Sequence, residues 1–333
     1  MMQNIPETMK AISLKKPGTA ENMVLAQTAI PKIRGTDVLI KVHAAGINMP
    51  DILQRRGNYP PPKGESGILG LEVAGTIARV GKNVKNWKIG DKICALVSGG
   101  GYAQYCTAPS GQCLPIPKGF SYAEAAGIPE TFFTVWSNIV DRAKIKKGQS
   151  ILIHGGSGGI GTCAIQLAKV LGCTVYVTAG SDKKCKFCKK IGADEAINYK
   201  KTDFEKKIKN ITQRKGVDVI LDSIGGNYVE KNIKILSKNG FLINIGWQKG
   251  SSVSINMMPI MLKRLTITGS TLRIRSVSFK TKVAKALLKN VWPYFEKKII
   301  RPIIFETIPI KDAKKAHKLM ESSKHIGKIV LEL

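Results

Sequence analysis

The chain has 333 residues, 43% of them hydrophobic, which is long enough for two domains and too apolar for a largely disordered protein. Its 53 Lys and Arg against 23 Asp and Glu give a formal charge of +30, which favours anionic ligands and loose association with nucleic acid or membrane surfaces. No run approaches the ~20 apolar residues of a membrane-spanning helix, and residues 1–8 lack the order of a signal peptide, so we expect a cytoplasmic protein.

From Met9 the chain alternates short apolar runs with Gly and Pro, which predicts a β-rich region. The expected strands are 10–14, 38–44, 70–80, 92–96 and 103–108. From about residue 133 to residue 271 the pattern becomes strand, helix, strand, which predicts a parallel, doubly wound sheet. The expected strands of that sheet are 150–154, 174–178, 196–198, 217–222, 241–245 and 265–268.

The C-terminal tail offers a helix at 280–295, a strand at 303–308, a helix at 311–322 and a last strand at 328–333. Because this tail is too short to bury a core alone, we expect it to pack onto the N-terminal β-rich region. The sequence therefore predicts a discontinuous domain of residues 1–132 and 273–333, and a continuous domain of residues 133–272.

The cysteines are odd in number and scattered over a long chain, so we expect reduced thiols. They are Cys94, Cys106, Cys113, Cys163, Cys173, Cys185 and Cys188. The lysine excess is also spread along the whole chain. We interpret it as a habit of the source proteome rather than as a dedicated anion site.

A glycine-rich turn follows the predicted strand at 150–154. In the run ILIHGGSGGIG at 151–161, Gly156, Gly158 and Gly161 have the G-x-G-x-x-G spacing. The first glycine permits a tight turn, the second lets the backbone approach a pyrophosphate, and the third allows a helix to pack closely on the strand. A helical pattern follows, so unpaired N–H groups and a positive dipole end point at the turn. These features predict a dinucleotide site, and a P-loop is excluded because no Gly-Lys-Ser/Thr follows.

The end of the second strand of this domain bears on the choice of cofactor, because an NAD enzyme would place a carboxylate there. The stretch VTAGSDKK at 177–184 instead offers small residues that leave room for a 2′-phosphate, and Lys183 or Lys184 to supply charge. We therefore favour a role for these lysines in binding NADPH over the alternative that they are a solvated pair at the start of a helix. Asp182 would weaken the preference for NADPH if its carboxylate faced the ribose.

Several further segments carry specific patterns. They are AGIN at 45–48 with Asp51, RGNY at 56–59, ILGLE at 68–72, IPETFFTVW at 128–136, DSIGG at 222–226 and IGKIVLEL at 326–333. Together with the glycine turn they resemble the zeta-crystallin-like quinone oxidoreductases of the medium-chain dehydrogenase/reductase superfamily, from Met9 to Leu333. The Pro-Glu-Thr segment points to the stress-inducible NADPH:quinone reductase branch. The resemblance implies a GroES-like fold for the β-rich domain, a Rossmann fold for the other, and a homodimer joined near 265–271.

The resemblance also implies roles for single residues. Asn48 and Tyr59 would line the nicotinamide pocket, Thr134 would lie near its carboxamide, and His325 falls where the branch usually has Asn. The pyrophosphate would be bound by Gly156, Ser157, Gly158, Gly159, Ile160 and Gly161, with Gly159 and Ile160 as backbone donors. The group around the 2′-phosphate would be Gly180, Ser181, Lys184 and Tyr199. The ribose and nicotinamide side would be held by Ile224, Gly225, Gly246, Trp247 and Leu272.

The sequence predicts no zinc. A catalytic site needs about three ligands from Cys, His and acidic residues, yet Asn48 stands near the place of a ligand cysteine and Leu71 in the place of the histidine before Glu72. The span 94–113 lacks the close four-cysteine spacing of a structural zinc lobe, and the C-x-x-C at 185–188 lies on a predicted helix without a second pair. We expect Glu72 and His154 to be buried, hydrogen-bonded structural groups.

Without a metal, hydride transfer must rest on holding the dihydronicotinamide against an acceptor whose developing charge is met by positioned donors. Quinones suit this chemistry because they are electrophilic and become aromatic on reduction. We expect Asn48 and Tyr59 to be the catalytic polar groups, with the proton coming from Tyr59 or water, although Tyr59 could equally be a packing residue near the cofactor.

Two other functions stay open. Metal-free relatives with similar Asn-x-x-Asp and Gly-Asn-Tyr patterns reduce enoyl thioesters, and Tyr59 would then be a true acid. Some zeta-crystallin relatives bind single-stranded RNA, and this chain is very basic, but it has no recognisable RNA-binding motif.

Overall fold

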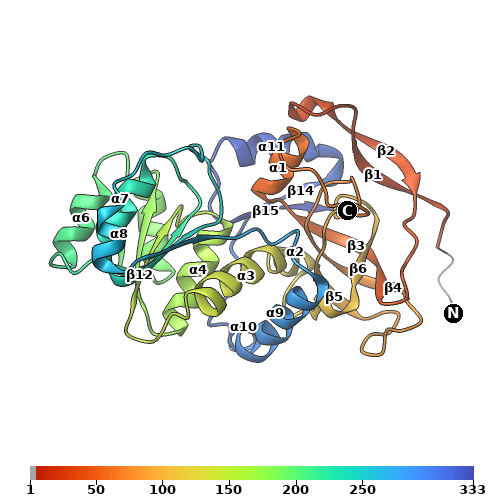
Figure 1. Ribbon diagram of the computed structural model, residues 1–333. Helices are drawn as coiled ribbons and strands as arrows, with labels where there is room; N and C mark the ends of the chain where they lie inside the picture. The colour runs from red at the N-terminus through yellow and green to blue at the C-terminus, as the bar shows by residue number, and fades with distance from the viewer. Residues whose placement is uncertain (1–4) are drawn as a thin grey trace. The chain divides into compact units, whose positions relative to one another are not determined.

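The computed structural model describes residues 5–333 and divides them into two compact units (Figure 1). The first unit consists of the described residues up to Phe133 together with Leu272–Leu333, and the second is Thr134–Thr271. Each unit has a sheet of its own. Within residues 5–333, no helix has both the length and the apolar character needed to cross a membrane.

The first unit is built on a mostly antiparallel sheet of seven strands. Its order is β14-β15-β3-β4-β5-β7, with β6 paired to β3. The strands are β3 (Asp37–Gly46), β4 (Glu72–Val80), β5 (Lys92–Leu96), β6 (Tyr105–Pro109), β7 (Cys113–Pro115), β14 (Ile304–Pro309) and β15 (Lys328–Glu332). The pairing of Leu331 with Ala45 joins the last strand to β3, so the C-terminal tail completes the N-terminal sheet.

A two-stranded antiparallel ribbon of β1 (Thr8–Leu14) and β2 (Met23–Ala29) accompanies this sheet. The α-helices here are α1 (Met49–Arg55), α2 (Tyr122–Ala126), α3 (Pro129–Val135), whose last two residues belong to the second unit, α9 (Val277–Asn290), α10 (Trp292–Glu296) and α11 (Ala313–Glu321). Single 3-10 turns are η1 (Ala20–Asn22), η2 (Ser110–Gln112) and η4 (Ile310–Asp312). Apolar side chains from both ends of the sequence, such as Ile40, Val73 and Leu331, share one core.

The second unit is a wholly parallel sheet of six strands in the order β10-β9-β8-β11-β12-β13. The strands are β8 (Ser150–His154), β9 (Thr174–Ala179), β10 (Glu195–Asn198), β11 (Val217–Asp222), β12 (Leu236–Asn244) and β13 (Thr266–Gly269). Successive strands are added from β8 toward β10 on one side of the sheet and from β11 toward β13 on the other. Their carboxyl ends therefore flank the switch point at which such sheets bind ligands.

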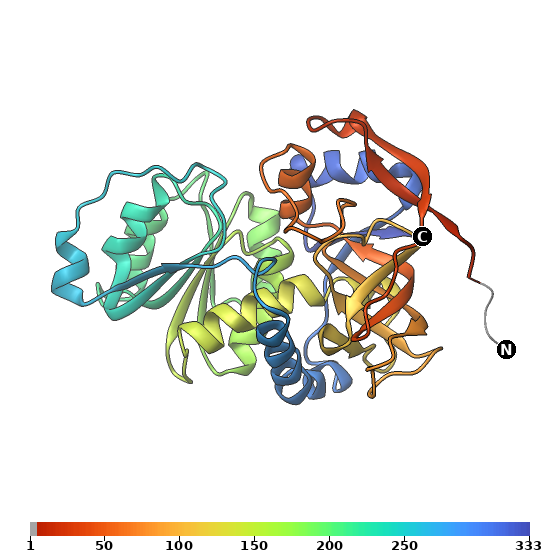
Figure 2. The ribbon, with the colours of Figure 1, turned by 45° about the vertical axis from the view of Figure 1, so that its right-hand side comes forward.

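Helices cover both faces of this parallel sheet (Figure 2). Because crossovers between parallel strands are right-handed, α4 and α5 lie on one face and α6 and α7 on the other. The helices are α4 (Gly159–Val170), α5 (Asp182–Lys190), α6 (Phe204–Ile211), α7 (Tyr228–Ile235) and α8 (Met258–Lys263), with the π-helix η3 (Trp136–Arg142) before β8. The parallel sheet buries apolar side chains on both faces, as at Leu152, Ile220 and Leu242.

The predicted fold class, a doubly wound parallel sheet with a β-rich domain, is confirmed. One predicted helix is wrong: the stretch 280–295 is two helices, because Pro293 in the first turn of α10 cannot continue α9, which ends at Asn290. The strand expected from Gly70 begins at Glu72, since Gly70 has φ +99°. Short elements such as β7 and α1 were not predicted.

Candidate functional site

The glycine turn of the second unit runs from residue 155 to residue 161, between β8 and α4, and is called the phosphate turn below. The N–H of Gly156 donates to Thr178 O at 2.9 Å and the N–H of Gly158 to Gly155 O at 3.0 Å, which closes the turn. Helix α4 begins at Gly159 with Gly158 as its N-cap. The N–H groups of its first turn have no intrahelical acceptor and are free to bind an anion.

The three motif glycines have different surroundings. A Cβ on Gly161 would overlap backbone atoms of Gly155 and Gly156, and one on Gly156 would lie 2.6 Å from the Cβ of Val177. A Cβ on Gly158 would meet only Gly155 O, at 3.6 Å. The first and third glycines are therefore required by packing, whereas the second leaves open space in front of the turn.

The residues expected around a 2′-phosphate come together at the end of β9. Tyr199 Oη lies 2.9 Å from where a Cβ on Gly180 would be, and the Ser181 hydroxyl accepts the N–H of Lys184 at 3.3 Å as the N-cap of α5. Lys184 is half-buried, and burial followed by the nearby charge of Lys200 lowers its pKa. A partly desolvated ammonium in the first turn of a helix capped by a serine is well suited to a phosphate.

The two neighbours of Lys184 differ from it. Lys183 is exposed, so of the two lysines considered from the sequence Lys184 is the one held in this group. Asp182 accepts Asn198 Nδ2 at 2.7 Å and Lys201 Nζ at 2.6 Å. Its carboxylate is thus engaged by side chains of the same unit.

The loop after β11 is organised by Asp222, which is fully buried. Its carboxylate accepts the N–H groups of Ile224 at 2.7 Å and Gly225 at 3.2 Å, and also the side chains of two asparagines. Gly225 lies against the ring of Trp247, and a Cβ on Gly246 would lie 3.2 Å from Ser223 O. The predicted residues after β11 and β12 are therefore adjacent, and Asp222 is a supporting residue that the sequence analysis did not assign.

His154 closes β8 just before the phosphate turn. Its ring nitrogens lie 2.9 Å from Thr178 Oγ1 and 2.8 Å from Asn232 Oδ1, and burial lowers its pKa. The expectation of a satisfied core histidine is confirmed.

In the first unit, Asn48, Glu72 and Lys328 form a closed set of hydrogen bonds, called the polar cluster below. Lys328 Nζ donates to Asn48 Oδ1 at 2.6 Å, to Glu72 Oε1 at 2.6 Å and to Ile47 O at 2.8 Å. Asn48 Nδ2 donates to Glu72 Oε1 at 2.9 Å. The three residues are at most 6% exposed. Glu72 is therefore buried and hydrogen-bonded as expected, and the orientation of the Asn48 amide is fixed by two charged neighbours.

Glu130 lies beside this cluster at the start of α3. Its N–H donates to Glu72 Oε2 at 2.8 Å, while its own side chain is 9% exposed. Burial, and then the negative charge of Glu72, raise the pKa of Glu130 to about 8. Glu130 is therefore largely protonated at neutral pH.

A second buried set supports α1. Asp51 accepts the N–H of Asn48 at 2.8 Å and of Gly70 at 3.1 Å, and also the Tyr102 hydroxyl at 3.1 Å. Tyr102 Oη lies 3.2 Å from His317 Nε2. Burial raises the pKa of Asp51 to about 6 despite these donors, and it lowers that of His317 to about 3.

Tyr59 is half-buried in the loop after α1. Its hydroxyl makes no hydrogen bond within residues 5–333, and none joins it to Asn48. Its ring is covered by the guanidinium of Arg273 at 5.6 Å, and Arg273 Nη1 approaches Tyr59 O at 3.4 Å. Burial and the charge of Glu130 raise the pKa of Tyr59, so the hydroxyl keeps its proton at neutral pH.

The remaining predicted residues are divided between the units. Thr134 opens the second unit, where its carbonyl accepts Asn138 Nδ2 at 2.8 Å. Leu272 and His325 belong to the first unit, in which the rings of His325 and Phe305 lie 6.5 Å apart. The predicted site residues are thus Asn48, Tyr59, Leu272 and His325 in the first unit and all the others in the second.

Metal-ligating side chains do not cluster in the described residues. No group of three or more His, Cys, Asp or Glu side chains in residues 5–333 could hold a metal ion. The cysteines are all buried and none forms a disulfide, including Cys185 and Cys188 of α5. Glu72 is instead paired with the Lys328 ammonium, which the sequence analysis missed because the two residues are 256 positions apart in the chain.

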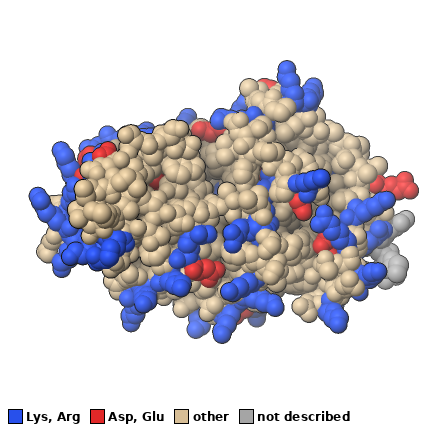
Figure 3. All heavy atoms as spheres, in the orientation of Figure 1, with Lys and Arg blue, Asp and Glu red and all other residues tan. Residues whose placement is uncertain are grey.

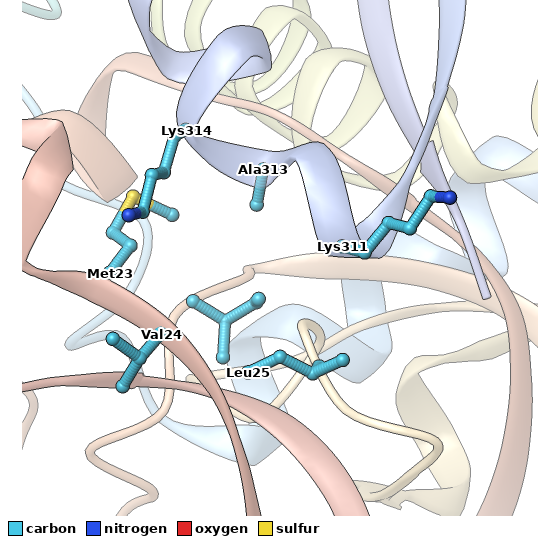
Figure 4. Close-up of a pocket in the computed structure, with 7 residues that line it drawn as sticks. Met23, Val24, Leu25, Lys311, Ala313 and Lys314 are labelled. Carbon is cyan, nitrogen blue, oxygen red and sulfur yellow. The ribbon is translucent and has the colours of Figure 1, made fainter.

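Two hollows lie wholly within the first unit. A pocket of about 240 Å³ is lined by side chains from β2 and from the start of α11, including Leu25, Ala313 and Lys314 (Figure 4). It contains none of the predicted site residues. A cavity of about 450 Å³ lies between the β1–β2 ribbon and the loops at 66–68 and 99–100.

Basic side chains are spread over the visible face of the molecule rather than gathered in one patch (Figure 3). Many of the lysines form surface ion pairs, as Lys169 does with Asp194 and Lys231 with Asp203. This distribution agrees with the interpretation of the lysine excess as compositional.

Comparisons with known proteins agree with this geometry. The family model for the alcohol dehydrogenase GroES-like domain matches residues 34–118, and that for zinc-binding dehydrogenase matches residues 159–288. The quinone oxidoreductase of Rattus norvegicus is 31% identical over 328 residues, 98% of each chain. The crystal structure of Escherichia coli quinone oxidoreductase complexed with NADPH has a TM-score of 0.85 at 26% identity, covering 98% of this chain and 100% of that one. CurK enoyl reductase has a TM-score of 0.87 at 25% identity, covering 98% and 99%.

Proposed function

The chain belongs to the quinone oxidoreductases of the medium-chain dehydrogenase/reductase superfamily, and on that premise we propose that it is a zinc-independent NADPH:quinone oxidoreductase. It is an oxidoreductase that uses a nicotinamide cofactor and acts on small molecules. Independence from zinc is supported by the residues Asn48 and Leu71, which cannot replace thiolate and imidazole ligands.

The preference for NADPH rests on Lys184. Lys184 is half-buried in the first turn of α5, which Ser181 caps beside Gly180 and Tyr199, while Asp182 is held by Asn198 and Lys201. A charged contact to a phosphate contributes roughly 1.5–3 kcal/mol, or about tenfold or more in affinity. Lys184→Met should therefore weaken NADPH binding about tenfold and leave NADH binding unchanged.

Lys183→Met is the matched control, because it removes the same charge from the adjacent exposed position. Dissociation constants for both coenzymes, measured by calorimetry, would distinguish the two variants. Equal effects on NADPH binding in both would mean that only the general charge of the surface matters. In that case the assignment of Lys184 fails.

When bound, the nicotinamide supplies a hydride to the acceptor, which needs donors for its developing charge and then a proton. Tyr59 has a protonated hydroxyl without a partner in the described chain, and so can donate. The Asn48 amide is held by Lys328 and Glu72, and it contributes a fixed dipole rather than a mobile group. The observation that carries the proposal is this pair of polar groups in a family whose named relatives reduce quinones.

The acceptor can be tested directly with NADPH and a panel that includes 9,10-phenanthrenequinone and a trans-2-enoyl-CoA. We expect rapid quinone reduction in the wild type and in Tyr59→Phe at most a tenfold loss, because water can replace the phenol as proton source. Strong enoyl turnover that disappears in Tyr59→Phe would favour the enoyl reductase alternative. The structural similarity to CurK enoyl reductase is the observation that supports this alternative. An unchanged urea-denaturation midpoint is the control for folding.

We also propose a homodimer joined through the open edge of β13. Ile267 on this strand is 38% exposed, and Met261 and Leu262 of α8 are 66% and 63% exposed. An unpaired strand edge beside exposed apolar side chains favours pairing with a second copy. Sedimentation should report a dimer for the wild type and a monomer for Leu262→Asp. The cytoplasmic location and the weak, non-specific attraction for nucleic acid stay predictions.

A further inference from the structure

Arg273 is a buried cation whose bonding capacity is only partly used. Arg273 is 5% exposed, and its Nε donates to Ser98 O at 2.8 Å. Its Nη1 has a long contact of 3.4 Å with Tyr59 O. Its Nη2 is buried and has no hydrogen-bond partner within residues 5–333. A buried guanidinium nitrogen without an acceptor is rare enough to require a physical reason.

Lys280 is a second buried cation at the same place. It is 3% exposed, and its Nζ donates to the carbonyl oxygen of Arg273 at 2.8 Å and to Ser98 Oγ at 3.3 Å. One of its three N–H groups is left over after these two bonds. Ser98 therefore anchors both cations, and the two positive charges are held side by side.

No ion pair neutralises Arg273 or Lys280 in the part of the chain that the structure describes. Three acidic groups act on these cations from within the protein. Asp51 acts on Arg273 and already accepts the N–H groups of Asn48 and Gly70 and the Tyr102 hydroxyl. Burial raises the pKa of Glu130 to about 8, so Glu130 contributes little negative charge at neutral pH. Glu65, the third acidic group that acts on these cations, is paired with Arg34 at 3.6 Å. Burying two unneutralised cations is costly unless an anion completes the site.

The unpartnered nitrogen lies close to the backbone at Gly99. A Cβ on Gly99 would lie 3.4 Å from Arg273 Nη2 and closer still to the carbonyl oxygens of Ser66 and Ile68, so backbone closes this side of the guanidinium. Gly99, Gly100 and Ser66 line the cavity of about 450 Å³. Arg273 and Lys280 do not line this cavity, so an anion would reach the guanidinium on its Tyr59 side, where the contact with the half-buried Tyr59 is long.

We propose that Arg273 and Lys280 form an anion site that binds a negatively charged oxygen of the electron acceptor beside Tyr59. This inference rests on the proposed function, because it assigns the anion to the acceptor. It adds a specificity-determining pair to a site for which the sequence named only Asn48 and Tyr59. Neither cation belongs to a glycine motif or to a recognised metal position.

The negative oxygen has two possible sources. It is either a fixed anionic substituent of the acceptor, such as a carboxylate or sulfonate, or the quinone oxygen itself. In the second case the quinone gains a hydride, with two electrons, from NADPH, which leaves NADP⁺ and a hydroquinone anion. That anion then takes a proton from Tyr59 or water. Arg273 would meet the charge before the proton arrives.

The test compares 1,2-naphthoquinone with 1,2-naphthoquinone-4-sulfonate in the wild type, Arg273→Met and Arg273→Lys. Arg275→Met is the matched control, because it removes the same charge two residues away from an exposed side chain. A fixed anionic group predicts a rise of about tenfold or more in KM for the sulfonate alone. A developing oxyanion predicts a similar fall in kcat for both quinones. In either case Arg273→Lys should lose less activity than Arg273→Met, since lysine keeps the positive charge but lacks the paired N–H groups of the guanidinium.

Calorimetric titration with NADPH accompanies these rates and reports whether each variant is folded. Unchanged kinetics in Arg273→Met, with NADPH binding intact, would overturn the proposal; if that variant does not fold, the same comparison is made with Arg273→Lys and Lys280→Met. If the wild type binds NADPH but reduces neither quinone, the proposed function fails, and the anion site is tested separately by titrating 1,2-naphthoquinone-4-sulfonate. Heat of sulfonate binding that is present in the wild type and lost in Arg273→Met supports the site. The absence of that heat in the wild type contradicts it.

Discussion

The phosphate turn and the polar cluster are built in opposite ways. The turn uses one run of backbone at residues 155–161, where glycines are required by close packing at Gly156 and Gly161. The cluster uses the side chains of Asn48, Glu72 and Lys328, which meet because β15 pairs with β3. A site made of consecutive backbone can be recognised from its motif, whereas a site made of distant side chains depends on the whole sheet.

The largest effect is expected from Lys328→Met, because it leaves the Glu72 carboxylate buried without its ion pair. We expect the free energy of unfolding to fall by about 3–5 kcal/mol, measured by urea denaturation. The control is the double variant Lys328→Met with Glu72→Gln, which removes both charges and should recover at least half of the loss. A loss below about 1 kcal/mol in the single variant would mean that the cluster is not held by this pair.

Gly161→Ala tests the turn in the same way. The new Cβ would overlap backbone atoms of Gly155 and Gly156, so we expect about 1–3 kcal/mol of destabilisation and a loss of nucleotide binding. Gly158→Ala is the matched control, because its Cβ would meet only Gly155 O at 3.6 Å and its φ is −82°. It should fold normally. Equal instability in both variants would contradict the different roles of the two glycines.

Glu130→Gln tests the surroundings of the polar cluster through the pH dependence of stability. The folded pKa of about 8 lies above the ordinary value of 4.5, so the native state binds an extra proton between these pH values. The contribution of Glu130 to stability is present below pH 4.5 and is lost, at about 1.4 kcal/mol per pH unit, as the pH rises toward 8. The stability of Glu130→Gln relative to the wild type should therefore increase from pH 5 to pH 8. A difference that is independent of pH would show that Glu130 is ionised in the folded protein.

Asp182→Asn should have the smallest effect. Its carboxylate is 57% exposed and pairs with Lys201 on the surface, where solvent screens the pair, so we expect no measurable change in the urea-denaturation midpoint. Because Asp182 is engaged by Asn198 and Lys201, the ratio of NADPH to NADH affinity should stay within about twofold. A large gain in NADPH preference would indicate that Asp182 acts on the ribose.

The sequence predicted the parallel sheet and the phosphate turn because both depend on local periodicity and on glycines at fixed spacing. It also predicted that Glu72 is buried. It did not predict Lys328, Arg273 or Lys280 as site residues, since a lysine in a chain with 53 Lys and Arg gives no signal of burial. The division of the helix at 280–295 was likewise missed, although Pro293 was a readable signal.

The central claim is that the phosphate turn binds a dinucleotide and that Lys184 selects its phosphorylated form. Calorimetric titration of the purified protein with NADPH and with NADH tests it most directly. We predict one binding site per chain for NADPH, and affinity for NADH at least tenfold weaker. The absence of heat with either coenzyme would contradict the claim.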